Sequence, residues 1–424
     1  MKIIRYTYKF RLEPTEQQQV LLNKHFGSVR FVYNYFLNQR KNEYLNNKKT
    51  LNYYDQSKEL TQIKKLEDKK WLKEINSQTL QFSLNCLDTA YDGFFKKRTK
   101  FPKFKSRKSK NSFTIPQFVS VKKNKLYIPK FRKDGIEMIM ERKINGVIKH
   151  CVISKTPTGK YFVSILTEME YISMNKSGLS VGIDLGLKDF LVLSNGTKIK
   201  NHRFLKHYQH QLKLNQQSLS RKVKQSIRYE KQRIKVARIH EKISNSRMDL
   251  IHKTALDLIK QFDVIYLEDL NVKGMSHRCK SKQDENGKYL PNGQSAKSGL
   301  NKSILDVAWS TFINILEYKA EWNDKQVIHI DRFFPSSKTC SKCGWINNGL
   351  TLKDRTWDCK CGEKQDRDVN AAINILNEGY RKNISDGTSD YEHGAKIRPK
   401  KLGNGNEVLK EMNQFDSETT TSLV

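Results

Sequence analysis

Three acidic residues stand where an apolar run ends or a helix is expected to begin, and their placement constrains the fold most. Asp184 and Glu268 each end an apolar run, and Asp368 directly precedes a helical pattern. Carboxylate oxygens are hard ligands, so three that converge at strand ends suit a pair of Mg²⁺ ions that hold both oxygens of a phosphodiester in line. The pattern predicts the acid site of a nuclease.

Each of these acids also has a plainer interpretation. An Asp before a Gly is usually a turn residue, and Asp368 could serve only as a helix N-cap. Burial favours the functional interpretation of Asp184 and Glu268, because an unpaired carboxylate at the end of an apolar run is costly without a cation. Strand alternation sends Glu268 and Asp269 to opposite faces, so only one can reach the metals. Asp366 and Asp368 present the same choice, which the residues alone leave open.

The chain is strongly basic, and the surplus is unevenly distributed. Its 79 Lys and Arg exceed its 44 Asp and Glu, which gives a formal charge of +35. Residues 381–424 contain seven basic and seven acidic residues, so the whole surplus lies on residues 1–380. A body of this charge repels itself unless it binds a polyanion, and nucleic acid is the expected partner.

Nothing in the sequence predicts a membrane segment or an export signal. No apolar run approaches the roughly 20 residues that cross a bilayer, and residues 1–6 lack a signal-peptide core. We therefore expect a cytoplasmic protein that associates with nucleic acid, without structural disulfides and without a membrane partner.

Four of the seven cysteines form two close pairs. Cys340 and Cys343 are spaced C-x₂-C, fifteen residues follow, and Cys359 and Cys361 are spaced C-x-C. Four thiolates on two tight turns suit a tetrahedral structural Zn²⁺, as in a zinc ribbon. The alternative is four reduced surface thiols, but isolated cysteines would not pair in this way. The second pair is one residue shorter than usual.

The first hundred residues read as a strand followed by helices. Residues 1–12 alternate like a strand, residues 15–48 are expected to be helical with a break near Gly27, and a second helical stretch covers about 55–98. Residues 96–110 are then rich in Lys and Arg with interleaved phenylalanines, so they are either a nucleic-acid contact or a solvated linker. The candidate contacts are Lys96, Lys97, Arg98, Lys100, Phe101, Lys103, Phe104, Lys105, Arg107 and Lys108.

Residues 112–168 change to short alternating runs separated by turn signals. This pattern predicts an antiparallel sheet or a small barrel. The expected strands are Ser112–Ile115, Lys125–Ile128, Ile136–Glu141, Gly146–Ser154 and Tyr161–Thr167.

From Leu179 onward the pattern predicts a mixed α/β sheet. Its expected elements, in order, are a strand at 180–185, a hairpin at 190–199, two long basic helices within 203–262, a strand at 263–267, a helix at 304–322, a strand at 326–331 and a helix at 369–377. Residues 273–301 are poor in apolar residues, and we interpret them as a mobile loop beside the site, with an ordinary surface insertion as the alternative.

Several motifs together resemble the TnpB (OrfB) family of insertion-sequence proteins, which are RNA-guided DNA endonucleases related to type V CRISPR effectors. The resemblance covers about residues 5–380. The motifs that carry it are Gly182–Gly186, Leu267–Asn271, Ser337–Gly344, Asp366–Ala372, Gly27–Asn34, Pro102–Lys105 and Arg247–Lys253.

The resemblance implies a multidomain α/β protein with an RNase H-like (RuvC) nuclease domain. The implied parts are an antiparallel β-barrel or wedge (1–12 and 112–178), a helical recognition lobe with a basic linker (13–111), the nuclease domain (179–336 and 363–380), an inserted zinc ribbon (337–362) and a tail expected to be disordered (381–424).

The resemblance also implies roles for the acids and the cysteines. Asp184, Glu268 and Asp368 match the three RuvC acids, which hold two Mg²⁺, or Mn²⁺ in their place, and the four paired cysteines match the zinc ligands. The partners it implies are a structured, transposon-encoded guide RNA and a target DNA with a short flanking motif. Two alternatives stay open: an RNA-free DDE-type transposase or resolvase, and a non-catalytic nucleic-acid-binding transposition factor.

Overall fold

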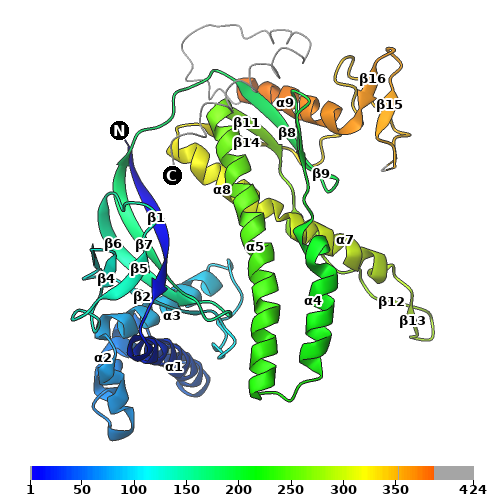
Figure 1. Cartoon of the computed structure of the whole chain (residues 1–424). Coiled ribbons are helices and arrows are strands. Elements are labelled where there is room, and N and C mark those ends of the chain that lie inside the picture. Colours follow the sequence, from blue (N-terminus) through cyan, green and yellow to red (C-terminus); the bar gives the residue numbers. More distant parts are fainter. Residues whose placement is uncertain (1, 352, 386–424) are drawn as a thin grey trace.

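The computed structural model describes residues 2–351 and 353–385. Figure 1 shows two bodies: a sheet with helices α1 to α3 against it, and a second sheet from which the long pair α4 and α5 extends alongside the first body. Within the described ranges, no helix is both long and apolar enough to cross a membrane.

The chain begins with a long strand and a long helix. β1 (Lys2–Glu13) agrees with the expected strand. α1 (Glu16–Asn47) begins at a capping box in which Thr15 and Gln18 bind each other's backbone N–H. The break expected near Gly27 is wrong, because α1 continues through this residue. A Cβ at position 27 would meet nothing within 4 Å.

The second helical stretch is divided into three elements. These are α2 (Tyr53–Ile63), the 3₁₀ helix η1 (Glu67–Glu74) and α3 (Ser77–Phe95). Asn52 caps α2 and Asn76 caps α3 through their side-chain oxygens, so the polar residues that divide the stretch also start its helices.

The first sheet has seven strands in the order β2-β6-β7-β1-β5-β4-β3, and all its neighbours are antiparallel. β3 (Ser120–Lys122), which the sequence pattern missed, pairs with β4 across a turn whose residues Lys123 and Asn124 both have positive φ. The remaining strands are β2 (Asn111–Ile115), β4 (Lys125–Tyr127), β5 (Ile136–Ile139), β6 (Val147–Lys155) and β7 (Tyr161–Tyr171).

This sheet and helices α1 to α3 share one hydrophobic core. Phe26 and Phe36 of α1 and Leu84 of α3 belong to the same buried cluster as Ile153 and Val163 of the sheet. The segments assigned by sequence to a wedge and to a recognition lobe are therefore packed together as one body.

The second sheet has five strands in the order β10-β9-β8-β11-β14. β8 lies in the middle, parallel to β11 and antiparallel to β9, and β14 extends the parallel part. The strands are β8 (Ser180–Leu185), β9 (Asp189–Leu193), β10 (Lys198–Lys200), β11 (Val264–Glu268) and β14 (Gln326–Ile330). The carboxyl ends of β8 and β11 therefore lie side by side.

Two helices form the long hairpin between β10 and β11. α4 (Phe204–Ser220) and α5 (Ile227–Gln261) pack through a small cluster of their own around Leu212 and Ile239. The carboxyl-terminal part of α5 joins the main core of the sheet through Ile251 and Leu258.

The region expected to be a mobile loop, 273–301, has regular structure. It contains α6 (Val272–Met275), a small hairpin of β12 (Lys282–Gln283) and β13 (Tyr289–Leu290), and the start of α7 (Gln294–Val307). The helix expected at 304–322 is in fact two helices, because Ala308 adopts a left-handed conformation (φ 58°) between α7 and α8 (Trp309–Trp322).

Helix α9 (Arg367–Ser385) is longer than the expected 369–377 and lies on the face of the sheet opposite α5 and α8. It also extends beyond residue 380, where the sequence placed the start of a disordered tail. The rest of that tail, residues 386–424, lies outside the described residues. Just before α9, a ribbon of β15 (Thr356–Asp358) and β16 (Lys364–Asp366) carries the second cysteine pair.

The two bodies meet along α5, where Lys160 of the first body pairs with Glu241 at 3.1 Å, and at the carboxyl end of α8. The side-chain oxygen of Asn323 accepts hydrogen bonds from the Tyr171 hydroxyl and from the Met174 N–H, both at 3.1 Å. The ring of Trp322 lies 5.5 Å from that of Tyr6. Because Tyr171 and Tyr6 belong to paired strands of the first sheet, these contacts fix that sheet against the second body.

Candidate active site and cysteine cluster

Asp184 is the penultimate residue of the central strand β8, on the face of the sheet that helix α9 covers. Gly182, two residues earlier, makes this packing possible, since a Cβ there would lie 2.2 Å from the carbonyl oxygen of Ala372 in α9. Only glycine allows the helix backbone to approach the strand so closely. Gly182 thus lets helix α9, which carries Asp368, pack closely on strand β8, which carries Asp184.

Glu268 and Asp269 take opposite directions at the end of β11, as strand alternation predicts. Glu268 accepts a hydrogen bond from the Ser336 hydroxyl and is partly buried. Burial raises its pKa, and the Ser336 hydrogen bond opposes that shift. Asp269 is exposed and pairs with Arg332. Glu268 is therefore the residue that reaches the cavity.

Asp366, not Asp368, caps helix α9. Its Oδ1 accepts from the N–H groups of Asp368 and Val369 at 3.1 Å, and its Oδ2 lies 2.6 Å from Lys198 Nζ. Asp368 sits in the first helical turn, where its carboxylate pairs with Arg367 at 3.0 Å and Arg355 at 3.4 Å. The interpretation of Asp368 as a mere cap is excluded.

The three acids line one cavity of about 700 Å³. Burial raises the pKa of Asp184 to about 7, and the neighbouring carboxylates of Glu268 and Asp368 contribute to the rise, while Arg367 opposes them. Such a shift means that the ionised form lacks sufficient positive charge around it. Three hard oxygen donors, one of them a buried carboxylate without a basic partner of its own, fit divalent cations such as Mg²⁺.

Sequence reasoning missed three further residues of this cavity: Ser336, Arg355 and Arg367. Arg355 comes from the cysteine-bearing segment and reaches the acids because its carbonyl accepts from the N–H of Arg367 at 2.8 Å. The Asp-Arg-Asp pattern could have drawn attention to Arg367, but no spacing signal identifies Ser336 or Arg355, because their approach depends on how distant loops fold.

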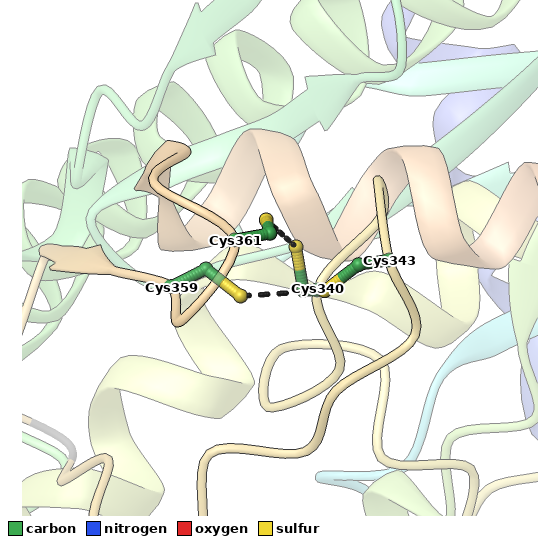
Figure 2. Close-up of side chains that lie close together, drawn as sticks. All are labelled: Cys340, Cys343, Cys359 and Cys361. Carbon is green, nitrogen blue, oxygen red and sulfur yellow. Dashed lines mark hydrogen bonds between the residues drawn. The ribbon is translucent and has the colours of Figure 1, made fainter.

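The four paired cysteines converge from two loops, as Figure 2 shows. Their sulfurs all lie within 4.8 Å of one another, with 3.8 Å between Cys340 and Cys361 and 3.4 Å between Cys343 and Cys359. Tetrahedral Zn–S bonds of about 2.3 Å place sulfurs about 3.8 Å apart. The shortened C-x-C pair reaches the cluster as well as the C-x₂-C pair does.

The backbone around the cluster also suits a metal. Gly344 and Gly362 both have φ near 80°, and each donates its N–H at 2.9 Å to the carbonyl of the first cysteine of its pair. Burial acts to raise the pKa of the Cys340 thiol, but the N–H groups of Cys343 and Lys342 lower it, whereas burial raises the pKa of the neighbouring Cys359 thiol. A Zn²⁺ ion would favour the ionised form of all four thiols.

The basic segment 96–108 is only partly free to contact a ligand. Lys96 pairs with Asp92 at 2.8 Å, and Phe101 packs edge-on against Phe94 with ring centroids 5.3 Å apart. Lys105 lies 3.8 Å above the ring of Tyr33, and burial lowers its pKa. These three side chains have partners within the protein. The other candidate contacts of the segment are all exposed, namely Lys97, Arg98, Lys100, Lys103, Phe104, Arg107 and Lys108.

Comparison with known proteins identifies the family. The chain is 35% identical over 384 residues to a "Putative RNA-guided DNA endonuclease" of Streptomyces pristinaespiralis. The match covers 89% of this chain and 90% of the relative. It is 34% identical to the "Putative RNA-guided DNA endonuclease InsQ" of Escherichia coli K12, over 88% of this chain and 92% of that one. A "TnpB-like protein" of Acanthamoeba polyphaga mimivirus is 24% identical, over 88% of this chain and 73% of that one.

The chain belongs to the TnpB (OrfB) family.

Three family models match separate parts of this TnpB-family chain. They are described as "Probable transposase" (residues 164–278), "Cas12f1-like, TNB domain" (309–375) and "Helix-turn-helix domain" (1–49). The last description does not fit the structure, since residues 2–47 form a strand and one uninterrupted helix.

A solved structure shares the fold. The protein in the cryo-EM structure of a Cas12f1–sgRNA–target DNA complex aligns with a TM-score of 0.52 at 13% identity, over 88% of this chain and 99% of that one. This likeness agrees with the multidomain α/β, RuvC-containing fold that the sequence predicted.

Proposed function

We propose that this TnpB-family chain is a transposon-encoded, RNA-guided DNA endonuclease that cleaves at the acid cluster with divalent metal ions. The observation that carries the proposal is the single cavity lined by Asp184, Glu268 and Asp368 in a chain whose family is known. Three carboxylates held close together destabilise the folded chain, and a protein that only bound nucleic acid would not need them.

The acid cluster supplies the ligands for the chemistry. Asp184, Glu268 and Asp368 would together hold two Mg²⁺ ions. When bound, the ions would activate a water molecule as the nucleophile and stabilise the leaving oxygen. The hydroxyl of Ser336 orients Glu268, and Arg355 and Arg367 hold Asp368 by ion pairs. The two guanidiniums also offer positive charge to a phosphate that enters the cavity.

The cysteine cluster is proposed to hold a structural Zn²⁺. Four sulfur ligands would complete a tetrahedral shell around the ion and leave no open position for water, so we expect no catalytic role for this site. It would instead stabilise the two loops that carry Arg355 and lead into helix α9.

Guide RNA and target DNA are the proposed partners. The relatives' printed names describe RNA-guided DNA endonucleases, and the similar Cas12f1 is seen with an sgRNA and a target DNA. In such a system base pairing supplies sequence specificity, while the protein holds the heteroduplex by its backbone and reads a short flanking motif. The charge of +35 suits this backbone role.

The deciding experiment uses the full chain with the RNA that copurifies with it. Cleavage of a DNA target should require that RNA, and changing its guide segment should move the cut. Glu268→Gln should abolish cleavage and keep DNA binding, whereas the neighbouring control Asp269→Asn should cleave like the wild type because Asp269 faces away from the cavity.

Two results would contradict the proposal. Cleavage by RNA-free protein at a fixed sequence or junction would favour a DDE-type transposase or a resolvase. Equal loss of binding and cleavage in Glu268→Gln would mean that Glu268 is structural.

A further inference from the structure

Two buried asparagines of α9 point at a loop rather than into the hydrophobic core. Asn370 is fully buried and Asn374 is 5% exposed, and they lie one helical turn apart on the same face. A buried amide is costly unless it is hydrogen-bonded, and asparagine is a poor helix former. Both amides bind the backbone of residues 336–341, which we call the linking loop.

Asn370 holds the backbone on both sides of Cys340. Its Nδ2 donates to the carbonyl of Thr339 at 2.7 Å, and its Oδ1 accepts from the N–H of Ser341 at 2.9 Å. The buried side chain of Gln365, two residues before α9, donates to the Cys340 sulfur at 3.4 Å. One end of the linking loop is therefore fixed both to α9 and to the cysteine cluster.

Asn374 holds the other end of the linking loop, next to the acid cluster. Its Nδ2 donates to the carbonyls of Ser336 at 2.7 Å and Thr339 at 2.6 Å. The hydroxyl of the same Ser336 donates to Oε1 of Glu268. Buried and part-buried hydrogen bonds thus connect the cysteine cluster, through the linking loop and α9, to a carboxylate of the acid cluster.

We propose that α9 and the linking loop couple the two clusters, with Asn374 and Ser336 as positioning residues for Glu268. Zinc held by the cysteines then fixes the loop, and the fixed loop presents Glu268 for a divalent cation. Coupling between two binding sites is reciprocal, so each metal should strengthen the binding of the other. This inference rests on the proposed function, since it takes the acid cluster as a divalent-metal site.

The test measures Mn²⁺ binding to the full chain without nucleic acid, by electron paramagnetic resonance, with zinc content determined on the same samples. The Asp184→Asn variant identifies which part of the Mn²⁺ signal belongs to the acid cluster. Wild-type protein should contain one zinc per chain. Residues that orient metal ligands typically contribute about 10–100-fold in metal affinity, so Ser336→Ala should weaken Mn²⁺ binding by on the order of 10-fold.

Four variants separate positioning from general stability. Ser336→Ala leaves the backbone carbonyl that Asn374 binds, so zinc content and the unfolding midpoint should stay near wild type. Asn374→Leu should weaken Mn²⁺ binding to a similar extent, and Asn377→Leu is the matched control, an exposed asparagine of the same helix. In the double variant of Ser336 and Asn374 the two losses should not add, because both act through the orientation of Ser336.

The outcomes distinguish this inference from the proposed function. If the wild type binds no Mn²⁺ at the acid cluster, the proposed metal site fails and the coupling fails with it. If the wild type binds Mn²⁺ and Ser336→Ala binds it equally tightly, the coupling alone is contradicted. Fully additive losses in the double variant would also contradict it, since they would mean two independent routes.

Discussion

At the scale of single residues, the carboxyl of Asp184 is the least favourably placed charge of the acid cluster. Burial raises its pKa to about 7, and the carboxylates of Glu268 and Asp368 add to the shift. Without a cation, the folded chain therefore binds a proton at Asp184 more tightly than the unfolded chain, whose Asp has an ordinary pKa of 3.8. A divalent cation beside Asp184 would favour its ionised form and oppose this shift of the pKa.

This environment predicts a pH-dependent effect of Asp184→Asn. The favourable contribution of protonated Asp184 is complete below pH 3.8 and is lost as the pH rises through 7, so the wild type loses stability over that range and the amide does not. With Mg²⁺ omitted, the variant should match the wild type near pH 4 and exceed its free energy of unfolding by about 2–4 kcal/mol at pH 8. Urea unfolding at both pH values is the measurement. A stability difference independent of pH would refute the assignment.

At the scale of elements, the packing of α9 on the second sheet depends on two glycine contacts. A Cβ on Gly182 of β8 would meet the Ala372 carbonyl oxygen at 2.2 Å, and one on Gly379 of α9 would meet the Tyr266 ring at 2.0 Å. At both places a backbone lies directly against its neighbour. Because α9 carries Asp368, these contacts set the distance between the third acid and the other two.

A pair of glycine substitutions tests this packing. Gly182→Ala should lower the free energy of unfolding by about 2–3 kcal/mol through overpacking, and should weaken cleavage because α9 is displaced. Gly27→Ala is the control: in the middle of α1, with open space around it, alanine should stabilise the chain by about 0.5–1 kcal/mol. Thermal and denaturant unfolding of both variants would show the opposite signs. If both substitutions changed the free energy of unfolding equally, Gly182 would not limit how closely α9 packs on β8.

At the scale of the whole molecule, positive charge is spread over both bodies. Residues 204–261, which include the α4–α5 hairpin, carry fourteen Lys and Arg against four acidic residues. On the other body, the basic segment 96–108 adds the exposed side chains of Lys97, Arg98, Lys100, Lys103, Arg107 and Lys108. A surface of this kind binds phosphates without reading sequence, which fits a protein whose specificity comes from base pairing.

This distribution predicts how RNA-free protein binds DNA. Binding should be weak, insensitive to sequence and steeply dependent on salt. Replacing Lys100, Lys103 and Arg107 together by Gln should reduce the slope of log K against log salt concentration by roughly 1 for each phosphate that these side chains neutralise in the wild type. Lys96→Gln should change the slope less, because Asp92 already holds that amine. Fluorescence anisotropy at several salt concentrations measures both. An unchanged slope in the triple variant would remove the segment from the interface.

The sequence by itself determined the elements and the candidate ligands, and the tertiary structure decided which ligands meet. Apolar periodicity located β8, β11 and the α4–α5 hairpin, since burial on one face leaves a local trace in the chain. The spacing of the cysteines likewise identified their cluster. The break expected at Gly27 was wrong because a glycine's local preference is small beside the packing of the whole helix.

The choices between neighbouring acids had to wait for the structure, although family resemblance favoured the same residues. Asp366 caps α9 and Asp269 pairs with Arg332, which leaves Asp368 and Glu268 for the cavity. Ser336 and Arg355 carried no signal at all, because each reaches the acids from a loop remote in sequence. Local sequence patterns indicate which face of an element is buried. Contacts between distant loops depend on the packing of the whole chain, and no short stretch of sequence predicts that packing.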